Sequence, residues 1–254
     1  MFPRQTTRIR FTMTRNDSDE TARGQDNRIF VLTGAGLSAE SGLGTFRDRG
    51  GLWSRFDLRE VATPEGFARD PDKVYEFYAL RRENLAGARP NAAHAALARL
   101  QSATGATLVT QNVDTLLEQA GARDVLHMHG RLDRALCAEC GARWDTGERL
   151  DATTPCPECT ARRARPDVVW FGEMPYGMDE IEAALSRTDL FVAIGTSGEV
   201  YPAAGFVEVA ARTGARTLEI NLEPTSARFD LRRTGPASEI VPAWVDEILG
   251  PRAR

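Results

Sequence analysis

Residues 28–36, RIFVLTGAG, contain the feature that indicates the fold, a short apolar run that ends in a glycine turn. Residues 29–32 are all apolar and include β-branched side chains, which is typical of a buried strand. Residues 34–39, GAGLSA, then fit a relaxed dinucleotide-binding fingerprint in which alanine replaces the third glycine. Glycines at this position let the backbone approach a pyrophosphate, although a plain tight turn uses the same residues.

Similar apolar runs alternate with amphipathic segments along the rest of the chain. The strand-like runs are 107–110, 125–128, 190–194 and 217–220, and the helix-like segments are 72–85, 92–100, 115–120, 179–186 and 203–212. This alternation predicts an α/β fold, a doubly wound, Rossmann-like parallel sheet with helices on both faces. Two stretches interrupt it. Residues 137–165 are polar and contain cysteines, which predicts a small inserted module, and residues 42–64 form a long loop of the kind that is usually functional.

Length and composition indicate an ordinary globular protein. A chain of 254 residues favours one main domain with a small satellite, and 42% hydrophobic with 27% charged residues excludes a fibre or a wholly disordered chain. No stretch approaches the roughly 18 to 20 apolar residues of a membrane helix. The net charge of -4 gives no electrostatic reason for a nucleic-acid partner. We therefore expect a soluble, cytoplasmic protein with no membrane partner.

The first 27 residues differ from the rest. Residues 1–15 include four arginines and no acid, as in a transit peptide, but polar residues follow and no apolar core of a secretion signal is present. We expect residues 1–27 to be a disordered tail, or the start codon to be placed too early, since Met13 is available. Residues 28–254 are then expected to form the folded domain.

All four cysteines of the chain fall into two Cys-x-x-Cys pairs, Cys137 with Cys140 and Cys156 with Cys159. This spacing predicts one tetrahedral zinc site within a module at about 131–166. Four thiolates leave no position for water, so the Zn²⁺ is expected to be structural. The alternative, two disulfides, requires an oxidising compartment, for which the sequence contains no targeting signal.

Polar residues follow the strand-like run 107–110, where doubly wound sheets bind ligands. Gln111, Asn112 and Asp114 are expected to bind a ligand there, and Asp114 is also placed to cap the next helix. Of the three histidines, His94 lies in an alanine-rich helix and is expected to be structural. His127 and His129 point to the same side of a strand, so alternation does not choose between them.

Several of these segments, in order along the chain, resemble the motifs of the sirtuin family. They are GAGLSAESGLGTFRDRGGLW at 34–53, TQNVDTLLEQAG at 110–121, HMHG at 127–130, the four cysteines, VVWFGE at 168–173, GTS at 195–197 and NLE at 221–223. The resemblance covers roughly residues 28 to 249. It implies an enzyme that uses NAD+ as co-substrate to remove acyl groups from lysines of protein substrates, releasing nicotinamide and O-acyl-ADP-ribose.

The resemblance also implies roles for individual residues. The family's base directly precedes a glycine, which selects His129 to deprotonate a ribose hydroxyl, and an ordinary imidazole pKa near 6.5 suits that task. Asn112 would position the ribose and a water, Asp114 would hold the nicotinamide amide, and Phe46 and Arg47 would lie over the cofactor. The remaining NAD+ contacts implied are Gly34, Ala35, Gly36, Gln111, Gly195, Thr196, Ser197, Asn221, Leu222, Glu223 and Ala237.

The peptide substrate is expected to lie extended between residues 171–173 and the loop after Gly198, paired through its main chain. The residues assigned to it on the first side are Phe171, Gly172 and Glu173. Tyr78 and Arg81 are three apart on a helix and share a face, where a phenol and a guanidinium can hold a carboxylate. A surface arginine packed on an aromatic ring is the alternative. The Tyr-x-x-Arg pair resembles the motif of the sirtuin branch that removes succinyl and malonyl groups, which implies that it binds the carboxylate of the acyl group.

Two other functions stay open at this point. One is a protein ADP-ribosyltransferase that uses the same cleavage of NAD+. The other is an NAD-responsive binding module whose zinc ribbon and basic residues 162–165 contact nucleic acid. His129 together with Asn112 argues against a pure binding module, and so short an arginine run is usually a solvated surface.

Overall fold

A computed structural model describes residues 28–43, 56–146 and 150–250 of the chain. Its main sheet has six parallel strands in the order β3-β2-β1-β7-β8-β9. The strands are β1 (Ile29–Thr33), β2 (Thr107–Thr110), β3 (Leu126–His127), β7 (Leu190–Ile194), β8 (Arg216–Asn221) and β9 (Leu231–Thr234). The predicted doubly wound α/β fold is confirmed. The strand order reverses between β1 and β7, and ligands of such sheets bind beyond the carboxyl ends of the strands at that point.

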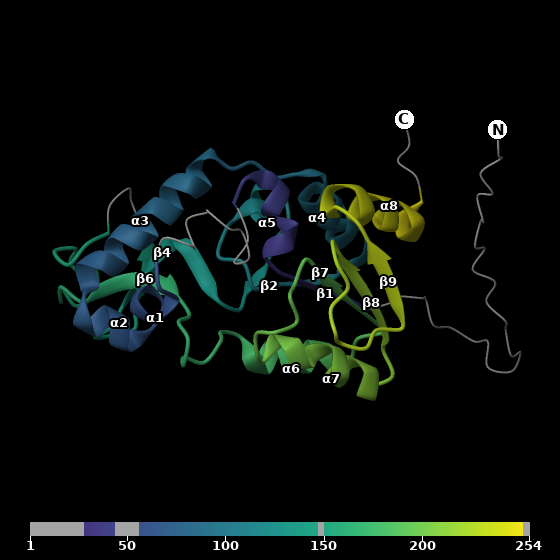
Figure 1. Ribbon diagram of the computed structural model, residues 1–254. Coiled ribbons are helices and arrows are strands. Elements are labelled where there is room, and N and C mark those ends of the chain that lie inside the picture. The colour runs from purple at the N-terminus through teal and green to yellow at the C-terminus, as the bar shows by residue number, and fades with distance from the viewer. Residues whose placement is uncertain (1–27, 44–55, 147–149, 251–254) are drawn as a thin grey trace, which may run out of the picture.

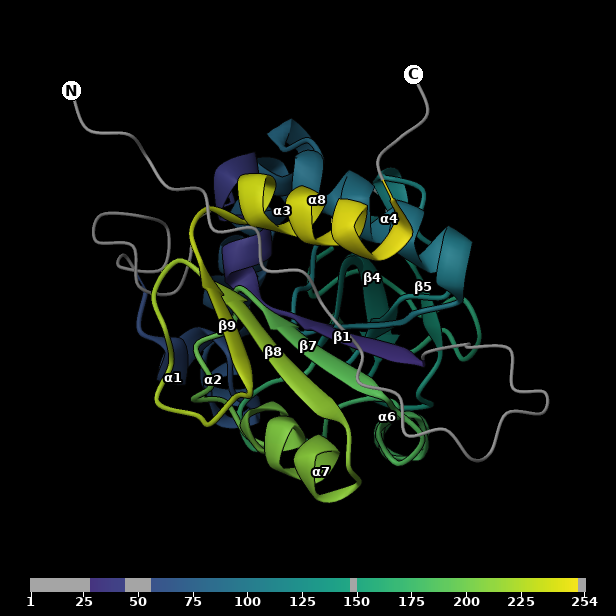
Figure 2. The same ribbon diagram turned by 90° about the vertical axis from the view of Figure 1, so that its right-hand side faces the viewer.

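Helices cover both faces of this sheet because β1 is apolar on both sides (Figure 2). Phe30 and Leu32 pack towards α6 (Met178–Leu185) and α7 (Phe206–Arg212), which the short turn η4 (Ala203–Gly205) precedes. Ile29 and Val31 pack on the other side towards α4 (Ala92–Thr104) and α8 (Ala237–Leu249). The alternation of side chains along a strand therefore explains both cores.

A second layer lies beside the main sheet (Figure 1). It combines α1 (Leu58–Val61), α2 (Pro64–Arg69) and α3 (Pro71–Gly87) with a three-stranded antiparallel sheet of order β5-β4-β6. Those strands are β4 (Gly130–Cys137), β5 (Arg143–Asp145) and β6 (Ala164–Val168). The long helix α3 begins with Asp70, whose side chain accepts a hydrogen bond from Lys73 N, and with a proline at its first position.

The structure differs from the predicted elements in several places. The predicted strand 125–128 is reduced to two residues, and the predicted helix 115–120 is the single turn α5 (Leu116–Gln119). The short turns η1 (Ala35–Leu37) and η2 (Ala39–Ser41) follow β1, and α1 lies within the segment 42–64 that was predicted to be a loop. Within the three described ranges no helix is long and apolar enough to cross a membrane.

Candidate functional site

Two glycine turns, one after β1 and one after β7, pack backbone against backbone. A Cβ atom on Gly34 would lie 2.7 Å from the Gly195 oxygen, and one on Gly36 would lie 2.7 Å from Gly195 Cα. Gly195 itself has φ +61°, and a Cβ there would lie 2.5 Å from Leu37 N. The packing of the two turns thus requires these glycines whatever ligand binds, so they do not by themselves indicate a dinucleotide.

Side chains join the carboxyl ends of four neighbouring strands. Thr33 Oγ1 donates to Thr110 Oγ1 at 2.8 Å between β1 and β2, and both groups are buried. Gln111 Nε2 donates to Thr196 Oγ1 at 2.9 Å, and Asn221 Nδ2 donates to the Thr196 carbonyl at 2.8 Å. The ends of β1, β2, β7 and β8 therefore form one polar edge at the switch point.

Ser38 is the centre of a buried hydrogen-bond network in this edge, a role that the sequence did not suggest. Its hydroxyl donates to Asp114 Oδ2 at 2.9 Å and lies 3.1 Å from Asn112 Nδ2, which can only donate to it. His94 Nε2 lies 3.3 Å away, and Asn112 Nδ2 also reaches the Gly34 carbonyl at 3.0 Å. Asn112 and Asp114, predicted to bind the ligand, are thus held by one hydroxyl.

His94 is a neutral, structural member of this network. It is fully buried at the third position of α4, where the Asn91 amide donates to its Nδ1 at 3.2 Å. The single Ser38 proton goes to Asp114, so His94 Nε2 holds the ring proton and donates to Ser38. Burial lowers the pKa of His94 to about 4. Burial also raises the pKa of Asp114, and hydrogen bonds from the Leu116 amide and from Ser38 oppose that shift.

The surroundings of the other two histidines differ. His129 Nδ1 lies 3.1 Å from the Gln111 carbonyl, which can only accept, so Nδ1 holds the proton and Nε2 has the lone pair. Burial lowers the pKa of His129, and the hydrogen bond to Gln111 opposes that shift. His127 instead has Nδ1 3.1 Å from the Asn112 carbonyl and Nε2 2.6 Å from Glu118 Oε1. Both nitrogens of His127 are occupied, so His129 is the histidine whose geometry suits a base.

The glycine after His129 has a physical reason. Gly130 begins β4 with φ +80°, and a Cβ atom there would overlap the Asp167 carbonyl oxygen of β6. The His129 carbonyl also accepts from the Val169 amide at 2.9 Å. His129 therefore lies where the main sheet and the second layer meet.

Tyr78 and Arg81 lie together on the inner side of α3. Tyr78 is 1% exposed, and Trp170 Nε1 donates to its hydroxyl at 2.9 Å. The Arg81 guanidinium lies 5.5 Å from the Tyr78 ring centre and 5.6 Å from that of Phe77. Burial lowers the pKa of Arg81, while Tyr78 and Asp114 favour its charged form. Arg81 thus packs on aromatic rings, as the alternative prediction had it, but it is half-buried and the charge of Asp114 acts on it.

The predicted peptide-binding residues differ in exposure. Phe171 is 53% exposed, and Gly172 has φ +91°. The Glu173 carboxylate is partly exposed and is held by Arg165, whose two terminal nitrogens donate to it at 2.6 and 2.9 Å, and by the Trp170 amide at 2.8 Å. A direct contact of the Glu173 side chain with the peptide therefore stays a prediction.

The four cysteines converge as predicted. Their Sγ atoms all lie within 4.8 Å of one another, with Cys137 to Cys159 at 3.7 Å and Cys140 to Cys156 at 3.6 Å. A tetrahedron with Zn–S bonds of about 2.3 Å has S···S edges of about 3.8 Å, so the set fits zinc. All four cysteines are free, and these distances far exceed an S–S bond of about 2.05 Å, so the disulfide alternative is wrong.

The remaining residues predicted to contact NAD+ lie on several different elements. Leu222 is 66% exposed, and Ala237 packs at the start of α8 in the core that includes Leu37. Phe46 and Arg47 lie outside the described residues. Ala35 is in η1, Ser197 accepts from the Glu199 amide, and Glu223 is exposed on the loop after β8.

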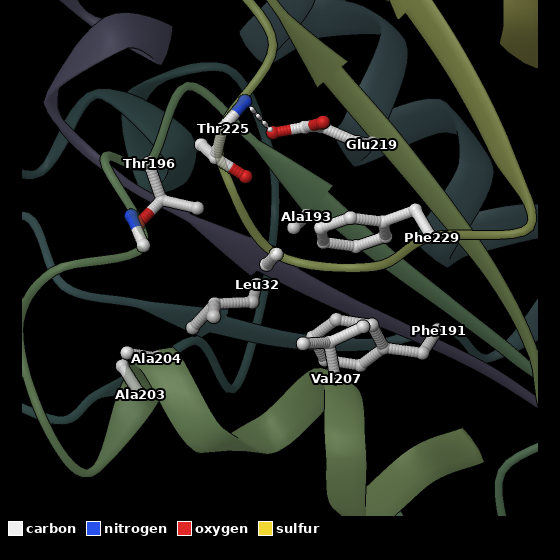
Figure 3. A pocket seen from close by; sticks show the side chains of 12 residues that line it. Leu32, Phe191, Ala193, Thr196, Ala203, Ala204, Val207, Glu219, Thr225 and Phe229 are labelled. Carbon is white, nitrogen blue, oxygen red and sulfur yellow. Dashed lines mark hydrogen bonds between the residues drawn. The ribbon is translucent and has the colours of Figure 1, made fainter.

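A cavity of about 20 Å³ beside Thr196 is not the dinucleotide site (Figure 3). It lies between the sheet and α7, and its lining is mostly apolar, including Leu32, Phe191 and Phe229. That volume holds about one water molecule, which is far too small for a nucleotide.

Comparison with known proteins gives four similarities. The sequence pattern of the Sir2 family matches residues 34–202. An NAD-dependent protein deacylase of Caulobacter vibrioides is 58% identical over 231 residues, which cover 87% of this chain and 97% of that protein. A solved Sir2 homolog–NAD complex is 38% identical with a TM-score of 0.80, covering 87% and 89% of the two chains. Sir2 bound to acetylated peptide is 25% identical with a TM-score of 0.74, covering 87% and 92%.

Proposed function

The chain belongs to the Sir2 family, and on this premise we propose that it is a protein deacylase that removes succinyl and malonyl groups from lysine as well as acetyl groups. The reaction class, NAD-dependent protein deacylation, follows from the family and from the relative that is 58% identical over nearly its whole length. The acyl preference is our inference from the residues around Tyr78 and Arg81.

The donor set at the polar edge fits NAD+. The hydroxyl and carboxamide groups of Thr196, Gln111 and Asn221 suit ribose hydroxyls, and Asp114 suits a carboxamide N–H. Bound NAD+ would supply the ribose carbon that the acyl oxygen joins as nicotinamide leaves. In this proposal Asn112, held by Ser38 and the Gly34 carbonyl, keeps its carboxamide oriented towards the ribose.

His129 is the proposed general base. Its Nδ1–H is held by the Gln111 carbonyl, which leaves Nε2 as the acceptor of a proton from a ribose hydroxyl. Because burial lowers its pKa, the imidazole is neutral at pH 7 and ready to accept. Gln111 thus contributes twice, by orienting the base and by contacting Thr196.

Zinc at the four cysteines would be structural. Four thiolates fill a tetrahedral shell and leave no position for a reacting water. Cys137 ends β4, and Cys156 and Cys159 precede β6, so the metal would join the two connections of the small sheet.

The observation that carries the acyl preference is a half-buried guanidinium beside a buried phenol, next to the proposed NAD+ site. A partly dehydrated cation gains most from an anionic ligand, and a carboxylate entering this space needs charged and neutral donors to replace its water. Succinyl- and malonyl-lysine end in such a carboxylate, whereas acetyl-lysine does not.

The test compares acetyl-, malonyl- and succinyl-lysine peptides with and without NAD+ in the wild type, Arg81→Met and Arg82→Met. Arg82 is the matched control, because it is the next residue of α3, has the same charge and lines a groove with Glu76 and Glu83 that does not include Arg81. Losing a charge-assisted hydrogen bond costs about 1.5 to 3 kcal/mol, so Arg81→Met should lower the succinyl-to-acetyl ratio of kcat/KM about ten- to a hundredfold. Equal losses for both peptides would show that Arg81 is structural.

A further inference from the structure

Trp170 is held rigidly behind the proposed acyl pocket. It is 2% exposed, its amide donates to Glu173 Oε2 at 2.8 Å, and the Arg165 guanidinium covers its ring face at 3.5 Å from the centre. Phe67 packs on the indole with a centre distance of 5.2 Å. The indole therefore has no freedom to turn, and its N–H is directed at the Tyr78 hydroxyl.

The donor inventory then decides what the Tyr78 hydroxyl can do. An indole N–H only donates, so the Tyr78 oxygen must accept from Trp170. A hydrogen bond with the Arg81 guanidinium, which also only donates, uses the second lone pair of that oxygen. The Tyr78 proton must therefore point elsewhere, and it has no acceptor among the described residues. Burial raises the pKa of Tyr78, so the hydroxyl keeps this proton at physiological pH.

Tyr75 on the same helix provides a contrast. Its hydroxyl donates to the Ala164 carbonyl at 2.6 Å, so its proton is already used inside the protein. Tyr75 is 7% exposed and belongs to a different core cluster, with Ala135 and Leu150. The two buried tyrosines, three residues apart, therefore also differ in whether the hydroxyl proton is already used inside the protein.

We propose that Trp170 is a positioning residue for acyl selectivity, because its N–H forces the Tyr78 hydroxyl to act as a donor towards the terminal carboxylate of the acyl chain. This inference rests on the proposed carboxylate pocket of Tyr78 and Arg81 and adds a residue that does not itself touch the substrate. Without the indole N–H, the Tyr78 oxygen would be free to accept from other donors and its proton free to rotate, so carboxylate binding would weaken.

The experiment measures the succinyl-to-acetyl ratio of kcat/KM for Trp170→Phe, Tyr78→Phe and the double variant. Removing one orienting hydrogen bond should lower the ratio about two- to tenfold in Trp170→Phe, mainly through KM for the succinyl peptide. The double variant should have the same ratio as Tyr78→Phe alone, because Trp170→Phe acts only through the Tyr78 hydroxyl. Two variants control for lost packing: Trp244→Phe, at an indole of α8 that is also 2% exposed, and Tyr75→Phe.

The outcomes separate the two proposals. Suppose first that Arg81→Met lowers the ratio, so that the carboxylate pocket stands. The role of Trp170 is then overturned by any of three results: an unchanged ratio in Trp170→Phe, a parallel loss for both peptides, or a full additional loss in the Tyr78→Phe background. If Arg81→Met itself leaves the ratio unchanged, the carboxylate pocket is wrong, and the role of Trp170 falls with it.

Discussion

Acid should destabilise the fold through His94 by an amount that the structure specifies. The folded-state pKa of His94 is about 4 and its ordinary value is 6.5, because burial disfavours the imidazolium. Between these values the unfolded chain binds the proton and the folded chain does not, so the contribution is fully present above pH 6.5 and is lost as the pH falls towards 4. Between pH 7.5 and 4.5 the loss is about 2.5 kcal/mol, or about 5 to 10 °C in Tm.

His94→Gln provides the matched reference, since glutamine hydrogen-bonds but does not titrate. The free energy of unfolding in urea is measured for both proteins at steps of pH between 7.5 and 4.5. Carboxylates and thiolates titrate in both, so their contributions cancel in the difference. We expect the wild type to lose about 2.5 kcal/mol relative to the variant over this interval. Parallel curves would refute the conclusion that His94 is held neutral by burial.

Two further predictions concern the cysteine module and the glycine that follows His129. Cys137→Ala should release zinc and lower both thermal stability and, indirectly, activity, because a closed thiolate site contributes folding energy; unchanged Tm and full activity in a preparation assayed as metal-free would contradict this. Gly130→Ala should cost about 3 kcal/mol or more, since the added Cβ overlaps the Asp167 carbonyl. Gly121→Ala, at φ +100° with open space around it, should cost less in the same thermal unfolding measurement.

The sequence predicted those parts of the molecule whose signal is local. Apolar runs located β1, β2, β7 and β8 because buried parallel strands are apolar on both faces. The zinc site was also predictable, because each Cys-x-x-Cys pair is a local pattern in the sequence. The edge strand β9, with sequence LRRT and mostly exposed, lacks such a pattern and was not predicted. The helix α8 was also not predicted, although it buries one face, and it contains Pro242, a residue that usually interrupts helices.

The contacts of the candidate site could not be predicted in the same way, because they join residues far apart in the chain. Ser38 and Asp114 are 76 positions apart, and Tyr78 and Trp170 are 92 apart. Strand alternation left His127 and His129 equivalent. The structure distinguishes them by their acceptors, since Glu118 occupies the second nitrogen of His127. A family motif pointed to His129, and the hydrogen bonds supply the physical reason.

The measurement that tests the central claim most directly is the yield of free-lysine peptide and of nicotinamide from succinyl-lysine peptide, for the wild type and His129→Asn. Without NAD+ the wild type should release no free lysine, and with NAD+ it should form one nicotinamide for each free lysine. Loss of the base should lower the rate on the order of 10² to 10⁴-fold, with thermal unfolding unchanged. A variant that keeps its activity, or lysine released without NAD+, would contradict the account.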